Sequence, residues 1–274
     1  MSPSEKRQRQ REGRGAAQQA RQKALRRRRR IRLLGLAVSV AAVLAVSTLA
    51  GQSDEQPGNK GSGNEPTPPP VACGGDTPRP AEVKRYEQAP EPGEVLNEGV
   101  DYGAVIQTSC GDITIDLLEA SAPRTVASFV FLADKGFYDG LKWFRIEDDF
   151  VIQTGDPDSR NSHAPDGAGY ELRGEVADTQ PRDYVYGTVA LANHGPDTGS
   201  SQFFVVVHKG DDGDTRIPAG LSPIYTIFGK VKESSYATLE TIASRATHEG
   251  AADPVKAVEP VNPVYIESLT ITRD

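Results

Sequence analysis

Apolar and polar residues alternate with a period of two in six short segments of the chain between about residue 95 and residue 274. This period directs one row of side chains into a core and the other toward solvent, as in a β-strand with one buried face. Turns that contain Gly, Asp and Pro separate the segments. We therefore expect strands within 102–109, 112–118, 186–193, 202–208, 225–231 and 264–272.

Two segments in the same region have a helical period instead. One begins at Pro123, a favoured first-turn residue, and its apolar positions continue toward Gly136, which is expected to end it. The other covers about 235–244, with Leu239 and Ile242 on one face. Many short strands with only two helices favour a closed or sandwich-like β architecture.

The N-terminal part contains a long apolar run that starts at Leu33, directly after a cluster of arginines. As a helix this run would be about 27 Å long, close to the thickness of the hydrocarbon core of a bilayer. We expect a single-pass signal anchor over 33–51 in the cell membrane, with the basic tail 1–32 in the cytoplasm and the rest of the chain outside it. A signal peptide cleaved after Ser47 or Ala50 is the alternative, and it would also export the body.

The segment 52–94 is rich in Gly, Ser and Pro and poor in large apolar side chains. Such a composition buries too little apolar surface to offset the entropy that folding costs. We interpret this segment as a flexible linker that joins the anchor to a globular domain over 95–274.

Charge is divided unevenly along the chain. The first 32 residues hold 13 of the 31 Lys and Arg and two of the 38 acidic residues, a net charge of +11, so the remainder has a net charge of −18. A negative field repels phosphate groups, so the body is not expected to bind nucleic acid.

The chain contains two cysteines, Cys73 and Cys110. They are too few for a disulfide-dense scaffold or for the four ligands of a structural zinc site. An exported location permits a disulfide between them, which would close a loop of about 37 residues. Two free thiols, or a bond to another chain, are equally compatible with the sequence.

The sequence lacks the short motifs of common hydrolase, metalloprotease and nucleotide-binding sites. Its four histidines are scattered singly, and its Asp-rich stretches lack the glutamate that completes a calcium-binding EF-hand loop. We therefore expect no metal site.

The stretch 142–157 predicts a strand, a turn and a second strand. Alternation places Arg145 and Gln153 among apolar side chains rather than in a charged surface row. The apolar neighbours are Phe144, Phe150 and Val151. A polar pair in this setting indicates a functional site, although a solvated arginine whose stem covers apolar surface is the commoner arrangement.

Four stretches resemble those of the cyclophilins, a family of peptidyl-prolyl cis-trans isomerases. WFRIEDDFVIQTGDP (143–157) is similar to the family's F-H-R-x-x-x-x-F-x-x-Q-G-G-D-P element, and LANHGPDTGSSQFFVVV (191–207) is similar to its M-A-N-x-G-P-x-T-x-x-S-Q-F-F element. The segments 122–141 and 225–231 resemble a helix and a late strand of the family. The resemblance covers about 102–272 and implies a closed eight-stranded antiparallel β-barrel capped by two α-helices.

The resemblance also implies the site residues, with no cofactor. Arg145 would donate a hydrogen bond to the prolyl nitrogen during rotation of the X–Pro bond, and Gln153 would bind the substrate carbonyl. Asn193 and its neighbours would hold the peptide main chain, while the apolar residues would hold the proline ring. The positions that match substrate-binding residues are Phe150, Val151, Ala192, Asn193, His194, Gln202, Phe204, Leu221 and Tyr225.

Three departures from the family pattern concern the groove. Gly220 precedes Leu221 where the family usually has a tryptophan, so cyclosporin A is expected to bind weakly. Thr154 replaces the first glycine of the Gln-Gly-Gly-Asp motif, and 157–170 replaces the glycine-rich turn that follows. We expect this side of the groove to be reshaped.

The sequence thus predicts a membrane-anchored isomerase, expected to be monomeric, that acts on proline-containing polypeptides and assists the folding of exported proteins. The second hypothesis is a proline-binding module or chaperone on the same fold, without a need for turnover. Arg145 favours catalysis, because a groove that only binds gains little from a donor directed at a pyramidal nitrogen.

Overall fold

The structure is a computed structural model that describes residues 68–79, 82–158, 167–210, 213–216 and 218–274. The predicted basic tail, the predicted membrane anchor and the first part of the predicted linker lie outside these residues. Within the described ranges, no helix combines the length and the apolar composition needed to cross a bilayer.

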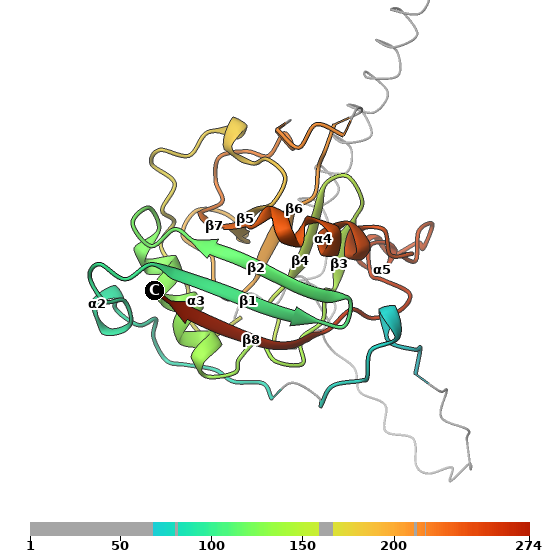
Figure 1. Ribbon diagram of the computed structural model, residues 1–274, viewed down its shortest axis with the longest axis horizontal. Helices are drawn as coiled ribbons and strands as arrows, with labels where there is room; N and C mark the ends of the chain where they lie inside the picture. Colours follow the sequence, from blue (N-terminus) through green and yellow to red (C-terminus); the bar gives the residue numbers. More distant parts are fainter. Residues whose placement is uncertain (1–67, 80–81, 159–166, 211–212, 217) are drawn as a thin grey trace, which may run out of the picture. The chain divides into compact units, whose positions relative to one another are not determined.

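Eight strands in the described part of the chain form one antiparallel sheet in the order β3-β4-β6-β5-β7-β2-β1-β8. Figure 1 shows β2, β1 and β8 as neighbouring strands, with the C-terminus at the end of β8. All six strands expected from the alternating pattern are present, and the strand-turn-strand unit supplies β3 and β4. The bounds are β1 (Tyr102–Thr108), β2 (Gly111–Leu117), β3 (Arg145–Glu147), β4 (Val151–Thr154), β5 (Thr188–Leu191), β6 (Phe203–Val206), β7 (Ile227–Val231) and β8 (Ile266–Arg273).

The register of the strands follows the alternation of the sequence. Ala104 and Ile106 of β1 are fully buried opposite Ile115 and Ile113 of β2, whereas Gln107 is exposed. Complete burial of one such isoleucine stabilises the fold by about 1.5–3 kcal/mol. A slip of one residue would turn these side chains toward solvent, so the apolar pattern specifies the pairing.

The prediction of a closed barrel is wrong, because the sheet is a half-barrel whose edge strands β3 and β8 do not pair as strands. Among the described residues, the two edges approach each other where the segment before β3 runs beside the start of β8 and the residues before it. There the Trp143 N–H donates to the Val264 carbonyl over 2.9 Å, and Lys142 and Tyr265 form an isolated bridge. Beyond Val264, the Pro263 carbonyl accepts from the Ala72 N–H instead.

The longer of the two predicted helices is α3 (Pro123–Asp134). Pro123 lies in its first turn and Gly136, with φ of +60°, follows its end. Phe129 packs its ring 5.5 Å from the ring of Phe203 on β6 and 5.1 Å from that of Phe228 on β7. These aromatic contacts attach the helix to the middle of the sheet.

The second predicted helix is α4 (Tyr236–Ala243), and Leu239 and Ile242 on its inner face are fully buried. The other helices are too short to show a helical period, and the sequence pattern did not predict them. They are η1 (Ala72–Gly74), α2 (Pro92–Val95), η2 (Pro181–Asp183), η3 (Glu233–Ser235) and α5 (Pro254–Ala257).

The predicted linker extends too far toward the C-terminus. Its described residues, 68–79 and 82–94, pack against the sheet domain, and with Val95 we call them the N-terminal strap. The Tyr86 N–H donates to the Ala168 carbonyl over 2.7 Å, and the Tyr86 ring lies 4.9 Å from that of Phe131 on α3. A segment with few apolar residues can be ordered when its backbone finds hydrogen-bond partners, which composition does not reveal.

A disulfide bond between Cys73 and Cys110 joins the strap to the turn between β1 and β2. The two Cα atoms are 5.2 Å apart, within the range that a disulfide requires. Beside the bond, the Ala72 N–H donates to the Pro263 carbonyl over 3.0 Å. Of the three arrangements that the sequence left open, the structure has the intramolecular pair.

We predict that Cys73→Ser lowers the free energy of unfolding by about 4 kcal/mol, because the bond restricts a long loop of the unfolded chain. Denaturant unfolding followed by the fluorescence of Trp143, the only tryptophan, measures this loss. Cys110→Ser and the double variant should lose the same amount, since each removes the same cross-link. A double variant clearly less stable than either single variant, or unchanged stability in all three, would contradict the prediction.

Candidate active site

Arg145 and Gln153 lie directly opposite each other on β3 and β4. The hairpin that joins these strands turns at Asp149, which has φ of +56°. Arg145 Nη1 donates to Gln153 Oε1 over 3.1 Å, and the guanidinium carbon lies 6.0 Å from the centroid of the Phe150 ring. The structure therefore brings together the arginine, the glutamine and the aromatic ring that alternation placed side by side.

Gln202, directly before β6, extends this polar row. Gln153 Nε2 donates to Gln202 Oε1 over 2.9 Å, and both side chains are buried. Gln202 Nε2 is also buried and has no hydrogen-bond partner among the described residues. Since an unpaired buried donor costs about 1–3 kcal/mol, a substrate carbonyl would offset this cost, but it reaches the nitrogen only if the side chains around it move.

An apolar cluster adjoins the polar row, because Phe204 of β6 is paired with Gln153 of β4. The Phe204 ring meets the Tyr225 ring edge-on, with centroids 5.2 Å apart. This cluster is separate from the main core of the domain. Its buried members are Val151, Tyr184, Ala190, Phe204, Val206 and Ala219, and Phe150, Ala192, Leu221, Tyr225 and Ile227 pack against them while partly exposed.

The predicted main-chain binding segment, 192–194, forms the adjacent rim. The Ala192 N–H donates to the Gln202 carbonyl over 2.9 Å, which ties the rim to the polar row. Asn193 Nδ2 donates to the Ile224 carbonyl over 2.7 Å, and the exposed His194 donates its backbone N–H to Thr198 Oγ1 over 2.8 Å. The Asn193 side chain thus braces the rim against the segment that carries Tyr225.

The position next to Leu221 is open. Gly220 is exposed with φ of +74°, and among the described residues other than its two chain neighbours no heavy atom lies within 4 Å of where its Cβ would be. Trp143 lies in the main core instead, fully buried with its ring 6.0 Å from that of Phe203. Position 220 therefore has no bulky side chain beside Leu221.

Thr154 is accommodated where the resemblance expects glycine. It is fully buried, and its hydroxyl donates to the Lys142 carbonyl over 2.8 Å. The next residue, Gly155, has φ of +90°, and a Cβ there would lie 2.4 Å from the Ser201 carbonyl oxygen. Only the second glycine of the motif is therefore required by close packing.

Tyr184 is a member of the apolar cluster that the sequence analysis missed. Its hydroxyl donates to the Tyr225 carbonyl over 2.7 Å and accepts from the Tyr225 N–H over 3.2 Å. Burial raises the pKa of Tyr184 to about 12, although the hydrogen bond with the Tyr225 backbone acts in the opposite direction. Burial also raises the pKa of Tyr225, while the positive charge of Arg145 opposes that rise.

Glu147 is a second residue that the sequence analysis missed. Its Oε1 accepts from Arg145 Nε over 2.7 Å and from Arg145 Nη2 over 2.5 Å. Residues two apart on a strand share a face, so the spacing of Arg145 and Glu147 was the available signal. The guanidinium is thus bonded along one edge to Glu147 and at the other to Gln153.

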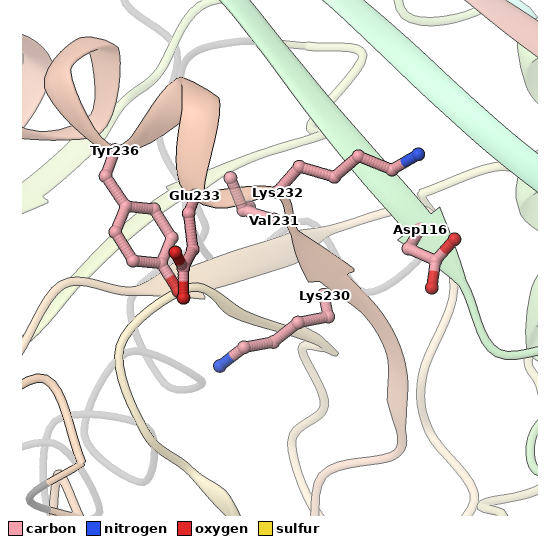
Figure 2. Close-up of a pocket in the computed structure, with 6 residues that line it drawn as sticks. All are labelled: Asp116, Lys230, Val231, Lys232, Glu233 and Tyr236. Atoms are coloured by element: carbon pink, nitrogen blue, oxygen red, sulfur yellow. The ribbon is translucent and has the colours of Figure 1, made fainter.

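Among the described residues, no group of three His, Cys, Asp or Glu side chains is placed to hold a metal ion. A hollow of about 400 Å³ near β7 and α4 shares no residue with the apolar cluster. Figure 2 shows Lys230 and Lys232 at this hollow pointing away from each other, and Lys230 Nζ donates to the Tyr186 carbonyl over 2.5 Å. Its charged groups do not converge, so we assign it no role.

Comparison with known sequences finds one family. A sequence model described as "Cyclophilin type peptidyl-prolyl cis-trans isomerase/CLD" matches residues 104–271. A Mycobacterium leprae protein named as a peptidyl-prolyl cis-trans isomerase B is 34% identical over 195 residues, 66% of this chain and 61% of that protein. A Staphylococcus haemolyticus protein named as a peptidyl-prolyl cis-trans isomerase is 34% identical over 186 residues, 61% of this chain and 89% of that protein. The match therefore spans about three fifths of the mycobacterial relative.

Comparison with solved structures finds the same fold. The crystal structure of a cyclophilin type peptidyl-prolyl cis-trans isomerase from Cryptosporidium parvum superimposes with a TM-score of 0.51 at 24% sequence identity, covering 64% of this chain and 99% of that chain. A second structure of that protein was determined in the presence of the dipeptide Ala-Pro. At this identity the likeness establishes the fold alone.

We predict that Tyr184→Phe reduces the loss of stability at alkaline pH. The pKa of Tyr184 is about 12 in the folded chain and 10.0 without the influence of the fold, so its stabilising effect is complete below pH 10 and is lost as the pH rises toward 12. The free energy of unfolding, measured by denaturant titration across this range, should fall less steeply in the variant. Equal slopes in the two proteins would contradict the assignment.

Proposed function

Because the chain belongs to the family of cyclophilin-type peptidyl-prolyl cis-trans isomerases, we propose that it accelerates rotation about X–Pro peptide bonds. The observation that carries this proposal is the position of Arg145. It lies between Gln153 and the Phe150 ring, next to an apolar cluster able to hold a proline ring.

The chemistry of the reaction explains why a donor is needed. Amide resonance gives the peptide bond a rotation barrier of about 18–20 kcal/mol, and an X–Pro bond isomerises only over tens of seconds or more. As the bond rotates, resonance is lost and the prolyl nitrogen gains a lone pair. A hydrogen bond to that lone pair forms only in the transition state and therefore lowers the barrier.

Some residues of the site would hold the proline ring, and others would assist rotation of the X–Pro bond. The Phe204–Tyr225 wall and Val151 would hold the proline ring still. Arg145 would donate to the prolyl nitrogen, and the unpaired N–H of Gln202 would donate to the substrate carbonyl once the side chains around it move. Gln153 has both ends of its amide engaged, so its role shifts from direct carbonyl binding toward alignment of Arg145 and Gln202.

We predict that Arg145→Ala lowers kcat/KM for an X–Pro peptide by about 10²–10³, the usual effect of removing one transition-state donor. An NMR exchange assay measures turnover, and titration with the same peptide measures affinity, which should stay within a few fold. Arg182→Ala is the matched control, because this side chain is 80% exposed and lies outside the site. Peptide binding without acceleration by the wild-type chain would instead support the second hypothesis, a proline-binding module or chaperone.

The proposal extends to the location of the protein. The apolar run over 33–51, with a basic tail before it, supports a single-pass membrane anchor with the domain outside the cytoplasm. The Cys73–Cys110 bond supports the same location, because disulfides persist in oxidising compartments. The substrates would then be exported polypeptides that fold there. Separately, the lack of a bulky side chain at Gly220 supports weak binding of cyclosporin A.

We predict that protease added to intact cells degrades the domain while a cytoplasmic control protein survives. The chain should sediment with membranes and resist extraction by high salt, because an apolar helix rather than charge holds it. A protein found in the soluble cytoplasmic fraction and protected from protease would overturn the proposed location. A soluble extracellular product shortened at its N-terminus would identify a cleaved signal peptide instead.

A further inference from the structure

We propose that Glu147 is a positioning residue for the reaction, which holds the guanidinium of Arg145 in the orientation that serves the substrate. This inference rests on the proposed isomerase function. Glu147 and Arg145 are two residues apart on β3, and Glu147 is paired across the ladder with Val151 of the apolar cluster. The carboxylate therefore lies on the face of the hairpin that carries the site.

The hydrogen bonds define the orientation. One oxygen of Glu147 accepts from Nε and Nη2 of Arg145, at 2.7 and 2.5 Å, while Nη1 donates to Gln153 Oε1 at 3.1 Å. Among the described residues, these bonds use three of the five N–H groups of the arginine. The two that remain, one on each terminal nitrogen, are available to a substrate.

A role in stability alone does not account for this pair. The side chains of Arg145 and Glu147 are 32% and 35% exposed, and ion pairs with such access to water add little to folding stability. An arginine side chain has several rotatable bonds, however, and a displacement of its donor by an ångström would slow the catalysed reaction. Fixing the Nε edge of the guanidinium removes that freedom without occupying the two N–H groups that remain.

The proposal predicts that Glu147→Ala in the full chain lowers kcat about fivefold while KM changes less than twofold. Glu147→Gln, which keeps an oxygen acceptor at the same place, should lose less. Asp148→Asn is the matched control, because it removes one negative charge at the next residue, which is exposed, and should leave kcat unchanged. In an Arg145→Ala background, Glu147→Ala should have no further effect.

Several outcomes would overturn the proposal. A kcat of Glu147→Ala equal to or above that of the wild type would mean that the carboxylate is neutral or competes with the substrate for Arg145. An equal loss in Asp148→Asn would indicate a general effect of charge, and an additional loss in the Arg145→Ala background would indicate a structural effect on the hairpin.

A spectroscopic measurement separates this proposal from the proposed function. The Arg145 Nε–H should give a distinct, slowly exchanging NMR signal that disappears in Glu147→Ala and persists in Asp148→Asn. If the wild-type chain shows no turnover but the signal behaves in this way, the proposed function fails while the positioning of Arg145 by Glu147 stands. If the signal is the same in Glu147→Ala and the wild type, the positioning role is wrong whatever the activity.

Discussion

The pairing of β4 with β3 on one side and with β6 on the other is the constraint on which the candidate site depends. It places Arg145 opposite Gln153 and Gln153 opposite Phe204. Residues paired across neighbouring strands share a face of the sheet, so one row carries the donor, the aligned amide and the apolar wall. A slip of one residue in either ladder would move part of this row to the other face.

Packing around the row limits such a slip. Gly155 follows β4 directly, and the Ser201 carbonyl oxygen lies too close to it for any residue with a Cβ to fit there. The N-terminal strap supports the same region from outside, because Tyr86 bonds Ala168 and the Ala168 N–H donates to Ser200 Oγ over 3.0 Å. The strap, which composition assigns to a flexible linker, is therefore part of the structure that surrounds the site.

Most of the strands and both main helices could be predicted from the sequence, because each buries one face and shows that face as a period of two or 3.6 residues. Short elements such as α2 and α5 could not, since four residues do not complete a period. The half-barrel could not be predicted either. Whether two edge strands pair depends on local contacts, such as the backbone hydrogen bonds of Trp143 and Pro263. The period of the apolar residues gives no information about such contacts.

The residues of the candidate site divide in the same way. Arg145, Gln153 and Phe150 were predictable because they belong to a single hairpin and the family motif covers them. Tyr184 was not, since it reaches Tyr225 across 41 residues of sequence through a hydroxyl bond. Glu147 was overlooked because a charged residue beside a turn usually belongs to the solvated surface.

The partial exposure of Arg145 suits the chemistry proposed for it. A guanidinium removed completely from water would need acceptors for nearly all its donors, which would leave none for a substrate. A fully solvated one would be screened and would act only weakly on a neutral nitrogen. At 32% exposure, bonded by Glu147 and Gln153 and flanked by an aromatic ring, the charge is ordered but still has donors to offer. Because the substrate must rotate as it reacts, a donor with this partial access to solvent fits the reaction better than one enclosed in the core.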